Sequence, residues 1–230
     1  MNIKDKTIVI SLGGSIIVPQ SGIDVSFLKE FDRFVRDKVT LGWKFYIITG
    51  GGITSRNYQK AAREIETLTD EDMDWLGIHA TRLNGHLLRS IFKDIAYPKV
   101  IHHFDKLEEI EEPVAIASGW KPGRSTDYDA VLMARKFGIK TLLNLSDIAQ
   151  VYDKDPKIYP EAKPVDKLNW DQFKEIVGTK WSPGLNAPFD PVAAELASEI
   201  GLKVVISEGR NFKNLEKFFS GEEFVGTTIE

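Results

Sequence analysis

Three short glycine-rich segments each follow an apolar run, and all three are suited to binding an anion. They are Gly13-Gly14-Ser15 after residues 7–10, Gly50-Gly51-Gly52 after residues 43–48, and residues 119–127 after residues 113–117. Glycine lets backbone N–H groups approach an anion closely, and the N-terminus of a following helix favours negative charge. An α/β sheet binds its ligands at the carboxyl ends of its strands. The three loops therefore predict a site for a nucleotide or a phosphorylated substrate.

The glycine spacing matches neither the P-loop nor the dinucleotide-binding fingerprint, so a kinase with these loops belongs to another class. Taken alone, Gly13-Gly14-Ser15 fits a tight strand-to-helix turn equally well. Gly50-Gly51-Gly52 is harder to explain as a simple turn. Glycine loses much conformational entropy on folding, so three in a row indicate that the backbone there needs a geometry that only glycine allows. Arg56 follows in the first turn of the next expected helix, where its guanidinium could reach an anion. The alternative is a solvated helix arginine.

Further polar residues stand where they could contact a phosphorylated ligand. Asp74 and Arg82 are eight residues apart and so share a helical face, although charged faces are commonly just solvated. Ser125-Thr126-Asp127 could receive a phosphate and could also cap a helix, and the two roles are compatible. Lys180 is either a mobile cation for transferring phosphates or a solvated lysine. The four histidines show no metal-ligand spacing, and we predict no protein-held metal site.

The composition argues against several classes of protein. At 230 residues the chain suits one large domain or two lobes sharing a sheet, with 42% apolar and 28% charged residues. A net charge of −4 provides no general electrostatic attraction for nucleic acid. The absence of cysteine excludes disulfides and thiolate chemistry. The chain has no basic-then-apolar leader and no apolar run of about 20 residues. We expect a cytoplasmic protein that binds neither nucleic acid nor membrane.

Apolar periodicity predicts alternating strands and helices. The expected strands cover residues 3–12, 43–49, 99–103, 113–118, 140–145 and 203–207. The expected helices cover residues 24–41, 54–68, 70–92, 127–137, 169–177 and 190–200, and the proline-rich residues 152–165 form a loop or hairpin. This alternation favours a largely parallel sheet covered on both faces, with right-handed crossovers.

Together these segments resemble the amino acid kinase superfamily and, within it, the archaeal-type uridylate (UMP) kinases. The similarity runs nearly end to end. Beyond the glycine segments it includes Arg56 and Tyr58, Gly77-Ile78, Thr81-Arg82, Asn84, Ser125-Thr126-Asp127, Val151-Tyr152, Asp155-Pro156, Asp190-Pro191, Ala193-Ala194 and the ending Gly226-Thr227-Thr228-Ile229-Glu230. The glycine motifs belong to the whole superfamily, whereas the helix around Asp74 and Arg82 and the C-terminal ending narrow the resemblance to uridylate kinase.

The resemblance implies an α/β fold, a three-layer αβα sandwich around a mostly parallel sheet, within a single amino acid kinase domain. Residues 1–138 would hold UMP, and residues 139–230 would hold ATP. The implied reaction transfers the γ-phosphoryl group of ATP to UMP with the help of Mg²⁺, giving UDP and ADP. The family assembles as homohexamers built as trimers of dimers, and the same assembly is expected here.

The same resemblance assigns roles to individual residues, in three groups. The phosphoryl-transfer channel would be lined by Gly13, Gly14, Ser15 and Lys180. UMP would be held by Gly51, Gly52 and Arg56 on its phosphate, Asp74 on its ribose, and Ser125 and Thr126 near its phosphate and base. The nucleoside of ATP would be framed by Ser146, Asp147, Tyr152 and Asp155.

The chain departs from the family pattern on its ATP side. The usual Thr-Asn-Val-Asp-Gly-Val-Tyr segment corresponds to residues 146–152, with Ala149 and Gln150 in place of aspartate and glycine. Bacterial uridylate kinases also carry a lysine in the first strand, which this chain lacks, as the archaeal type does. Two alternatives stay open. One is a kinase of the same fold acting on another small acceptor such as isopentenyl phosphate, and the other is a non-catalytic nucleotide- or oxyanion-binding protein.

Overall fold

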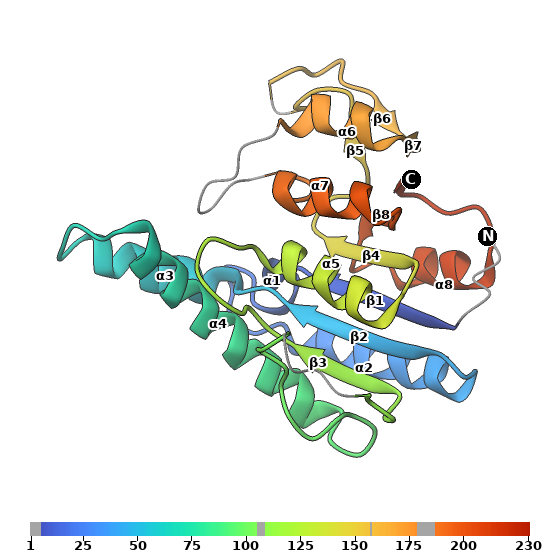
Figure 1. Ribbon diagram of the computed structural model, residues 1–230, viewed down its shortest axis with the longest axis horizontal. Coiled ribbons are helices and arrows are strands. Elements are labelled where there is room, and N and C mark those ends of the chain that lie inside the picture. The colour runs from blue at the N-terminus through green and yellow to red at the C-terminus, as the bar shows by residue number, and fades with distance from the viewer. Residues whose placement is uncertain (1–5, 105–108, 157, 179–186) are drawn as a thin grey trace.

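The computed structural model describes residues 6–104, 109–156, 158–178 and 187–230 (Figure 1). A seven-stranded sheet with the order β3-β2-β1-β4-β8-β9-β7 forms its framework. These strands are β1 (Thr7–Leu12), β2 (Lys44–Thr49), β3 (Val114–Ala117), β4 (Thr141–Ser146), β7 (Lys167–Leu168), β8 (Lys203–Glu208) and β9 (Thr227–Ile229). From β3 to β8 the neighbours are all parallel, while β9 runs antiparallel to β8. A separate antiparallel pair joins β5 (Val151–Tyr152) to β6 (Pro164–Val165).

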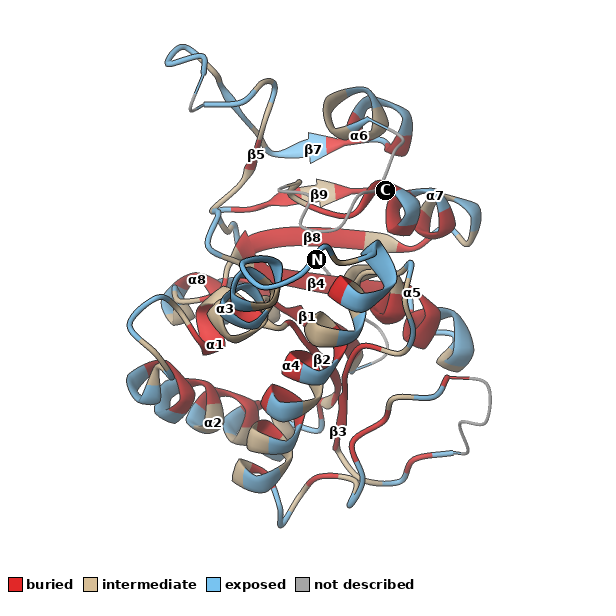
Figure 2. Ribbon diagram, turned by 90° about the vertical axis from the view of Figure 1, so that its left-hand side faces the viewer, coloured by how far each residue is buried: buried red, intermediate tan, exposed pale blue. Residues whose placement is uncertain are grey.

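Helices cover both faces of the sheet, which gives three layers (Figures 1 and 2). One face packs against α1 (Gly14–Ile17), α2 (Val25–Thr40), the C-terminal part of α4 (Asp70–Ile91) and α8 (Phe212–Ser220). The other packs against α5 (Thr126–Phe137), α6 (Trp170–Val177) and α7 (Pro191–Glu199). Helix α3 (Gly52–Arg63) lies against α4 and α1. Within the described part of the chain, no helix is long and apolar enough to cross a bilayer.

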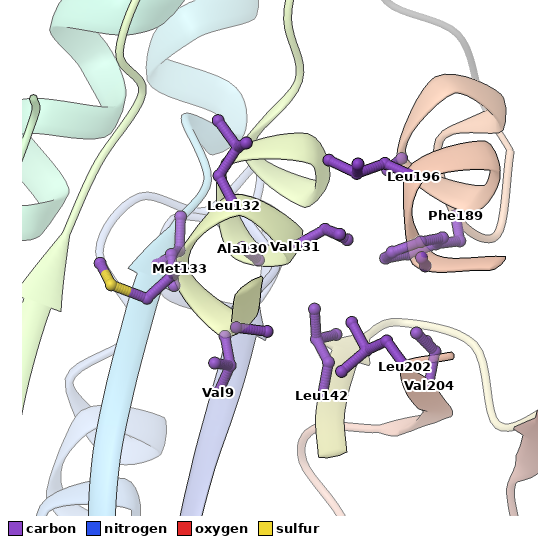
Figure 3. Packing of buried hydrophobic residues seen from close by; sticks show 14 of the residues in the cluster. Val9, Ala130, Val131, Leu132, Met133, Leu142, Phe189, Leu196, Leu202 and Val204 are labelled. Carbon is purple, nitrogen blue, oxygen red and sulfur yellow. The ribbon is translucent and has the colours of Figure 1, made fainter. Parts of the chain in front are cut away.

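The central strands are buried on both faces, which explains their continuous apolar sequences. In β1, Ile8 and Ile10 belong to the cluster under α2, while Val9 belongs to the cluster under α5. Figure 3 shows this second cluster, in which Val131 of α5 lies near Val9 and Leu142. The alternation follows from the two-residue period of a strand. The three-layer fold expected from the sequence is therefore confirmed.

Most predicted elements are present close to their predicted bounds, because the sequence marks their ends. Five of the predicted helices begin after a residue whose side chain accepts a hydrogen bond from a first-turn N–H, as a helix cap does. These residues are Asp24, Thr69, Ser125, Asn169 and Asp190. Gly138 ends α5 in the left-handed conformation, with φ of 64°. The hairpin expected within residues 152–165 is also present, as the β5–β6 pair.

Two predicted elements are wrong in extent or kind. Residues 99–103 form no strand, and only Ile101 makes an isolated bridge, to Ala117. The segment lies outside β3 at the edge of the sheet, where a strand gains one partner instead of two. The helix expected over residues 54–68 ends at Arg63. Ile65 beyond it is 86% exposed, so no core contact extends the helix.

The structure adds α8 and β9 to the predicted elements. Phe212, Leu215 and Phe218 stand at helical spacing between the cap Asn211 and a left-handed Gly221, so the signal for α8 is present in the sequence. Strand β9 has only three residues and antiparallel pairing to β8. A three-residue segment with two threonines carries little local signal.

Candidate active site

The predicted ligand loops leave from one edge of the sheet. Strands β1, β2, β3 and β4 are parallel neighbours, so their carboxyl ends lie together (Figure 1). From β1 the chain runs outward to β2 and β3, and it then returns to place β4 on the opposite side of β1. Open α/β sheets bind their ligands at such a switch point in strand order. The fold therefore brings the three glycine-rich loops to the position where a ligand is expected.

The first two glycine loops touch each other through their backbones. A Cβ atom on Gly14 would lie 2.0 Å from the backbone nitrogen of Gly52, and one on Gly50 would lie 2.4 Å from the nitrogen of Gly14. Gly52 also has a positive φ of 64°, which few other residues adopt. The Gly50 N–H donates to the carbonyl oxygen of Leu12 over 2.9 Å. Loop packing thus requires these glycines, apart from any ligand they bind.

The second loop leads directly into the N-terminus of α3. Its cap residue Gly51 has no side chain that could accept a hydrogen bond from the first-turn N–H groups. Such N–H groups, with the helix dipole, favour an anion. Arg56 lies in the same helix with an exposed side chain, and its guanidinium has no ion pair or hydrogen bond with any described residue. The guanidinium is therefore accessible to a phosphate. In the first turn of the helix the Ile53 N–H already donates to the Val18 carbonyl over 3.0 Å, so the N–H groups before it are the ones left for an anion.

Three hydrogen bonds fasten the third loop to α4, and two of them involve charged side chains. The carboxylate of Asp74 accepts the Gly123 N–H over 2.7 Å, and the guanidinium of Arg82 donates to the Trp120 carbonyl over 3.2 Å. Partial burial raises the pKa of Asp74, and the Gly123 N–H opposes that rise. The helical face predicted for Asp74 and Arg82 is therefore not merely solvated. It holds the loop that leads to Ser125.

Asp127 lies where β1, β4 and α7 meet. Its Oδ1 accepts hydrogen bonds from the Ser11 hydroxyl over 2.8 Å and from the Asn144 side-chain amide over 2.9 Å. Its Oδ2 accepts the backbone N–H of Asp190 over 3.3 Å. Burial raises the pKa of Asp127 to about 6, against the lowering effect of the Ser11 hydrogen bond. One carboxylate thus ties together four distant segments at the switch point.

Ser125, rather than Asp127, caps α5. Its hydroxyl accepts the backbone N–H of Tyr128 over 3.1 Å. Thr126 is the first residue of the helix. The sequence left the capping role open among Ser125, Thr126 and Asp127, and the structure assigns it to the first of them. Asp127 is thereby available for its contacts with the strand ends.

Asp129 is a second buried carboxylate, two residues after Asp127 in the first turn of α5. Its Oδ2 accepts the Trp120 N–H over 3.0 Å, and its Oδ1 is buried without a hydrogen-bond partner among the described residues. Burial raises the pKa of Asp129 to about 7, although the Trp120 N–H and the charges of Arg124 and Lys121 oppose this. The carboxyl group of Asp129 therefore holds the third loop to α5, while Asp74 holds it to α4.

The residues predicted to frame the nucleoside of ATP are only partly brought together. Ser146 ends β4 beside the first loop, because a Cβ on Gly13 would lie 3.5 Å from its Cα. Asp147 follows it and is exposed. Tyr152 and Asp155 instead belong to the β5–β6 hairpin, and the Asp155 carbonyl accepts the Tyr159 N–H over 2.8 Å. Lys180 lies outside the described residues.

Comparison with known proteins shows which family has this fold and these loops. The model of the amino acid kinase family matches residues 6–207. The chain belongs to the amino acid kinase family. It is 32% identical over 225 residues to a uridylate kinase of Methanocorpusculum labreanum, covering 96% of this chain and 94% of the relative. It is 32% identical over 226 residues to a uridylate kinase of Thermococcus kodakarensis, covering 97% and 99%.

Solved structures of this family have the same fold. The crystal structure of uridylate kinase from Archaeoglobus fulgidus superposes with a TM-score of 0.81 at 33% sequence identity, covering 97% of this chain and 99% of that one. A UMP kinase structure from Bacillus anthracis gives a TM-score of 0.76 at 22% identity. The second likeness concerns the fold alone. The resemblance inferred from the sequence motifs is confirmed at the level of the family.

At Ala149 and Gln150, where this amino acid kinase departs from the family's sequence pattern, the structure shows contacts made by the Gln150 side chain. The Gln150 side-chain amide donates to the Asp166 carboxylate over 2.7 Å and to the Gly226 carbonyl over 3.3 Å. Next to it, the Thr227 hydroxyl accepts the Val151 N–H over 2.8 Å and donates to a carbonyl of β6 over 2.6 Å. Gln150 thus helps to attach the hairpin to the C-terminal strand, a contact that the family's glycine could not make.

The site residues missed by the sequence analysis are mostly partners of Asp127. Ser11 and Asn144 are polar residues inside apolar strands, at positions 11 and 144, and that interruption was the available signal. The partner of each was not predictable from local sequence. Within the described residues, no three histidine or acidic side chains are grouped to hold a metal ion.

Proposed function

We propose that the protein is a uridylate kinase that transfers the γ-phosphoryl group of ATP to UMP, giving UDP and ADP. The observation that carries the proposal is similarity to proteins named uridylate kinase along 96–97% of the chain, well beyond the shared glycine motifs. The geometry at the carboxyl edge supports it, because the predicted acceptor loops meet there. In this proposal residues 1–138 bind UMP and residues 139–230 bind ATP.

On the acceptor side, the protein supplies position and positive charge. The nucleophile is the phosphate oxygen of UMP itself, so no covalent intermediate on the protein is needed. The N–H groups of Gly51 and Gly52 at the start of α3, together with the accessible guanidinium of Arg56, bind the UMP phosphate. Gly13, Gly14 and Ser15 lie against this loop and form the transfer channel. Lys180, predicted to contact the transferring phosphate, belongs to the same proposal.

The ribose and base of UMP are bound by the α4 helix and the third loop. Asp74 uses Oδ2 for Gly123, which leaves Oδ1 free to accept a ribose hydroxyl. The Ser125 hydroxyl accepts one hydrogen bond in its capping role, and its proton can still be donated to the substrate. Thr126 offers a second hydroxyl at the same helix start.

ATP binds on the far side of the first loop. Ser146 and Asp147 continue from β4 beside Gly13, and Tyr152 and Asp155 on the hairpin bind the nucleoside. Mg²⁺, when bound, neutralises charge on the transferring phosphates. Because the described residues contain no cluster of metal-binding side chains, they fit an ion held mainly by phosphate oxygens and water. Asp127 holds the ends of β1 and β4 at a fixed separation between the two substrates.

The proposal extends to assembly and location. We expect a cytoplasmic homohexamer, built as a trimer of dimers, as in the family that the sequence resembles. Tyr58 on α3, Ile65 just beyond that helix and Leu83 on α4 are 64%, 86% and 63% exposed, which offers apolar surface for subunit contacts. Size-exclusion chromatography with light scattering should give six times the 25.9 kDa chain mass. A monomer at assay concentration would contradict this part.

The deciding assay couples ADP release to a spectroscopic readout with ATP and Mg²⁺, and offers UMP, CMP, AMP and isopentenyl phosphate separately. We expect turnover with UMP and little with the others. Turnover with isopentenyl phosphate and none with UMP would replace the acceptor while keeping the kinase. Nucleotide binding without turnover of any acceptor would instead favour a non-catalytic binding protein.

A further inference from the structure

Arg210 extends from the C-terminal half of the chain to the helix that follows the first glycine loop. It lies in the loop after β8, and its Nη2 donates to the Ile16 carbonyl over 3.1 Å and to the Ser15 carbonyl over 3.5 Å. Its Nη1 forms an ion pair with Asp24. The central carbon of the guanidinium also lies 5.6 Å from the centroid of the Phe27 ring. Four contacts thus fix the direction of this side chain.

The sequence explains why α1 needs a donor from elsewhere. In a continuing helix the Ser15 carbonyl would accept the N–H of the residue four positions later. That residue is Pro19, which has no N–H. Helix α1 ends after four residues, so its last carbonyls need donors from outside the helix. The Ile17 carbonyl accepts the Asp24 N–H, and the Ser15 and Ile16 carbonyls accept from Arg210.

The contact is close enough to control the position of α1. Gly209, directly before Arg210, donates its N–H to the Ser146 carbonyl over 3.0 Å. A Cβ on Gly209 would lie 2.5 Å from Cδ1 of Ile16. The loop after β8 thus lies directly on α1, and its arginine bonds the helix end. Because α1 begins at Gly14, its position also sets that of Gly13-Gly14-Ser15.

We propose that Arg210 is a positioning residue for phosphoryl transfer, which holds the transfer channel in place from the ATP-binding half of the chain. The inference rests on the proposed kinase function. Arg210 itself need not touch either substrate. Its loss should therefore reduce the rate of the chemical step while leaving both substrates bound, since small misplacements of reacting groups have large effects on rate.

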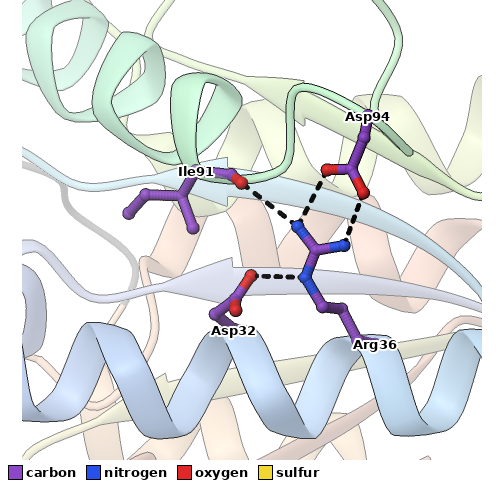
Figure 4. Close-up of polar contacts among 4 residues, drawn as sticks. All are labelled: Asp32, Arg36, Ile91 and Asp94. Carbon is purple, nitrogen blue, oxygen red and sulfur yellow. Dashed lines mark hydrogen bonds and ion pairs between the residues drawn. The ribbon is translucent and has the colours of Figure 1, made fainter.

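Arg36 provides a matched control within the same protein. Arg210 bonds one carboxylate and two carbonyls, and the Arg36 guanidinium likewise bonds three groups: the carboxylates of Asp32 and Asp94 and the carbonyl of Ile91 (Figure 4). The side chains of Arg36 and Arg210 are equally exposed, at 34% each. Arg36 lies near the opposite end of the sheet, because Asp94 closely precedes Ala96, which bridges to Val114 at the start of β3.

The test compares Arg210→Lys with Arg36→Lys in the coupled assay with UMP and ATP. Lysine keeps the charge but cannot reach the carboxylate and two carbonyls together as the guanidinium fork does. We expect Arg210→Lys to lower kcat by about 100-fold, with the KM values for UMP and ATP within about threefold of wild type. Arg36→Lys should keep kcat within about twofold. Both variants should lose similar amounts of thermal stability.

A second readout does not depend on activity. Amide hydrogen exchange at Ile16 and Val18, whose N–H groups donate to Gly13 and Gly14, should speed up in Arg210→Lys and not in Arg36→Lys. Asp24→Asn keeps the cap on α2 but removes the charge opposite Arg210, and it should lower kcat in the same way by a smaller factor.

Three outcomes distinguish this inference from the proposed function. An active wild type with equal kcat in Arg210→Lys and Arg36→Lys would overturn the inference alone. A rise in the KM values without a fall in kcat would also overturn it, because Arg210 would then act on binding. A wild type that releases no ADP with UMP would overturn the proposed function and the inference together.

Discussion

The two sides of the site that we propose, one for the acceptor and one for ATP, are held together in different ways. On the acceptor side, the loops after β1 and β2 meet through backbone atoms, with Gly14 against Gly50 and Gly52. On the ATP side, the β5–β6 hairpin is attached to the C-terminal strand by the side chains of Gln150 and Thr227. Where two backbones touch, any residue larger than glycine causes a steric clash. A side-chain contact can instead lose one hydrogen bond at a time. We therefore expect acceptor-side changes to be severe and ATP-side changes to be graded.

The most severe test is Gly14→Ala. Its new methyl group would lie 2.0 Å from the Gly52 nitrogen and 2.6 Å from the Gly50 carbonyl carbon, and backbone cannot move away as a flexible side chain can. We expect the free energy of unfolding to fall by about 3 kcal/mol or more, with loss of turnover. Urea unfolding and the coupled assay measure the two effects.

Gly77→Ala is the matched control for this change. Its new methyl group would meet side-chain atoms of Gln59 and Ser55 at an ordinary 3.4 Å, inside a helix that favours alanine over glycine. Its stability should equal or exceed that of the wild type. If Gly14→Ala behaved like this control, the backbone contact between the loops would not be the constraint described here.

Arg56→Ala tests the anion site on the acceptor side. Removing a hydrogen bond to a charged group costs about 2 kcal/mol, so the KM for UMP should rise about 30-fold while that for ATP stays nearly constant. Because the guanidinium has no partner among the described residues, stability should not change. Arg63→Ala, at the exposed far end of the same helix, should leave both KM values unchanged. Equal rises for UMP and ATP would contradict the assignment of Arg56.

Thr227→Val tests the ATP side. Valine keeps the shape but removes the hydroxyl, which leaves the Val151 N–H and the Val165 carbonyl without their partner. We expect a loss of about 1–3 kcal/mol in stability and a roughly fivefold rise in the KM for ATP alone. Thr228→Val, on the neighbouring and more exposed residue, should change neither. A larger rise in the KM for UMP than in the KM for ATP would show that the two substrates have been assigned to the wrong sides.

Asp129→Asn tests the buried carboxyl group under the third loop. Its pKa of about 7 in the folded protein exceeds the ordinary value of 3.8, so the folded state retains a proton that the unfolded state has lost. The bound proton therefore stabilises the folded state fully below about pH 4. As the pH rises from there to 7, the free energy of unfolding falls by about 1.4 kcal/mol per pH unit until this contribution is lost. Asparagine should flatten the curve over that range. Parallel stability curves for the two proteins, from urea unfolding, would exclude a raised pKa at Asp129.

The Asp129 comparison is not disturbed by the neighbouring carboxylate. Asp127 has a raised pKa of about 6, so it gives a pH dependence of the same sign. That dependence is present in both proteins and cancels in their difference. Only the slope that belongs to Asp129 remains.

The parts of the site that the sequence predicts are those with local causes. Apolar runs ending in glycine indicate both a buried strand and the loop that leaves it, and Arg56 follows within one helical turn. The same local signals predicted the five parallel strands. Residues 99–103 show the limit, because an apolar run at the sheet edge forms only an isolated bridge.

The roles of Asp127 and Arg210 could not be predicted in this way. Asp127 obtains its partners from β1, β4 and the start of α7, and its own sequence context equally fits a helix cap. Arg210 bonds carbonyls more than 190 positions earlier in the chain. Neither contact has a local period or motif.

By itself, the sequence determined the class of the fold, the family and the positions of the glycine-rich loops that we propose to bind a phosphate, because strand burial, helix caps and glycine turns depend on neighbouring residues. Only the tertiary structure decided which charged groups are brought to those loops. Parallel strands join segments distant in sequence, and the order β3-β2-β1-β4-β8 places the end of β1 between loops from both halves of the chain. The carboxylate of Asp127 and the guanidinium of Arg210 obtain their partners from that order.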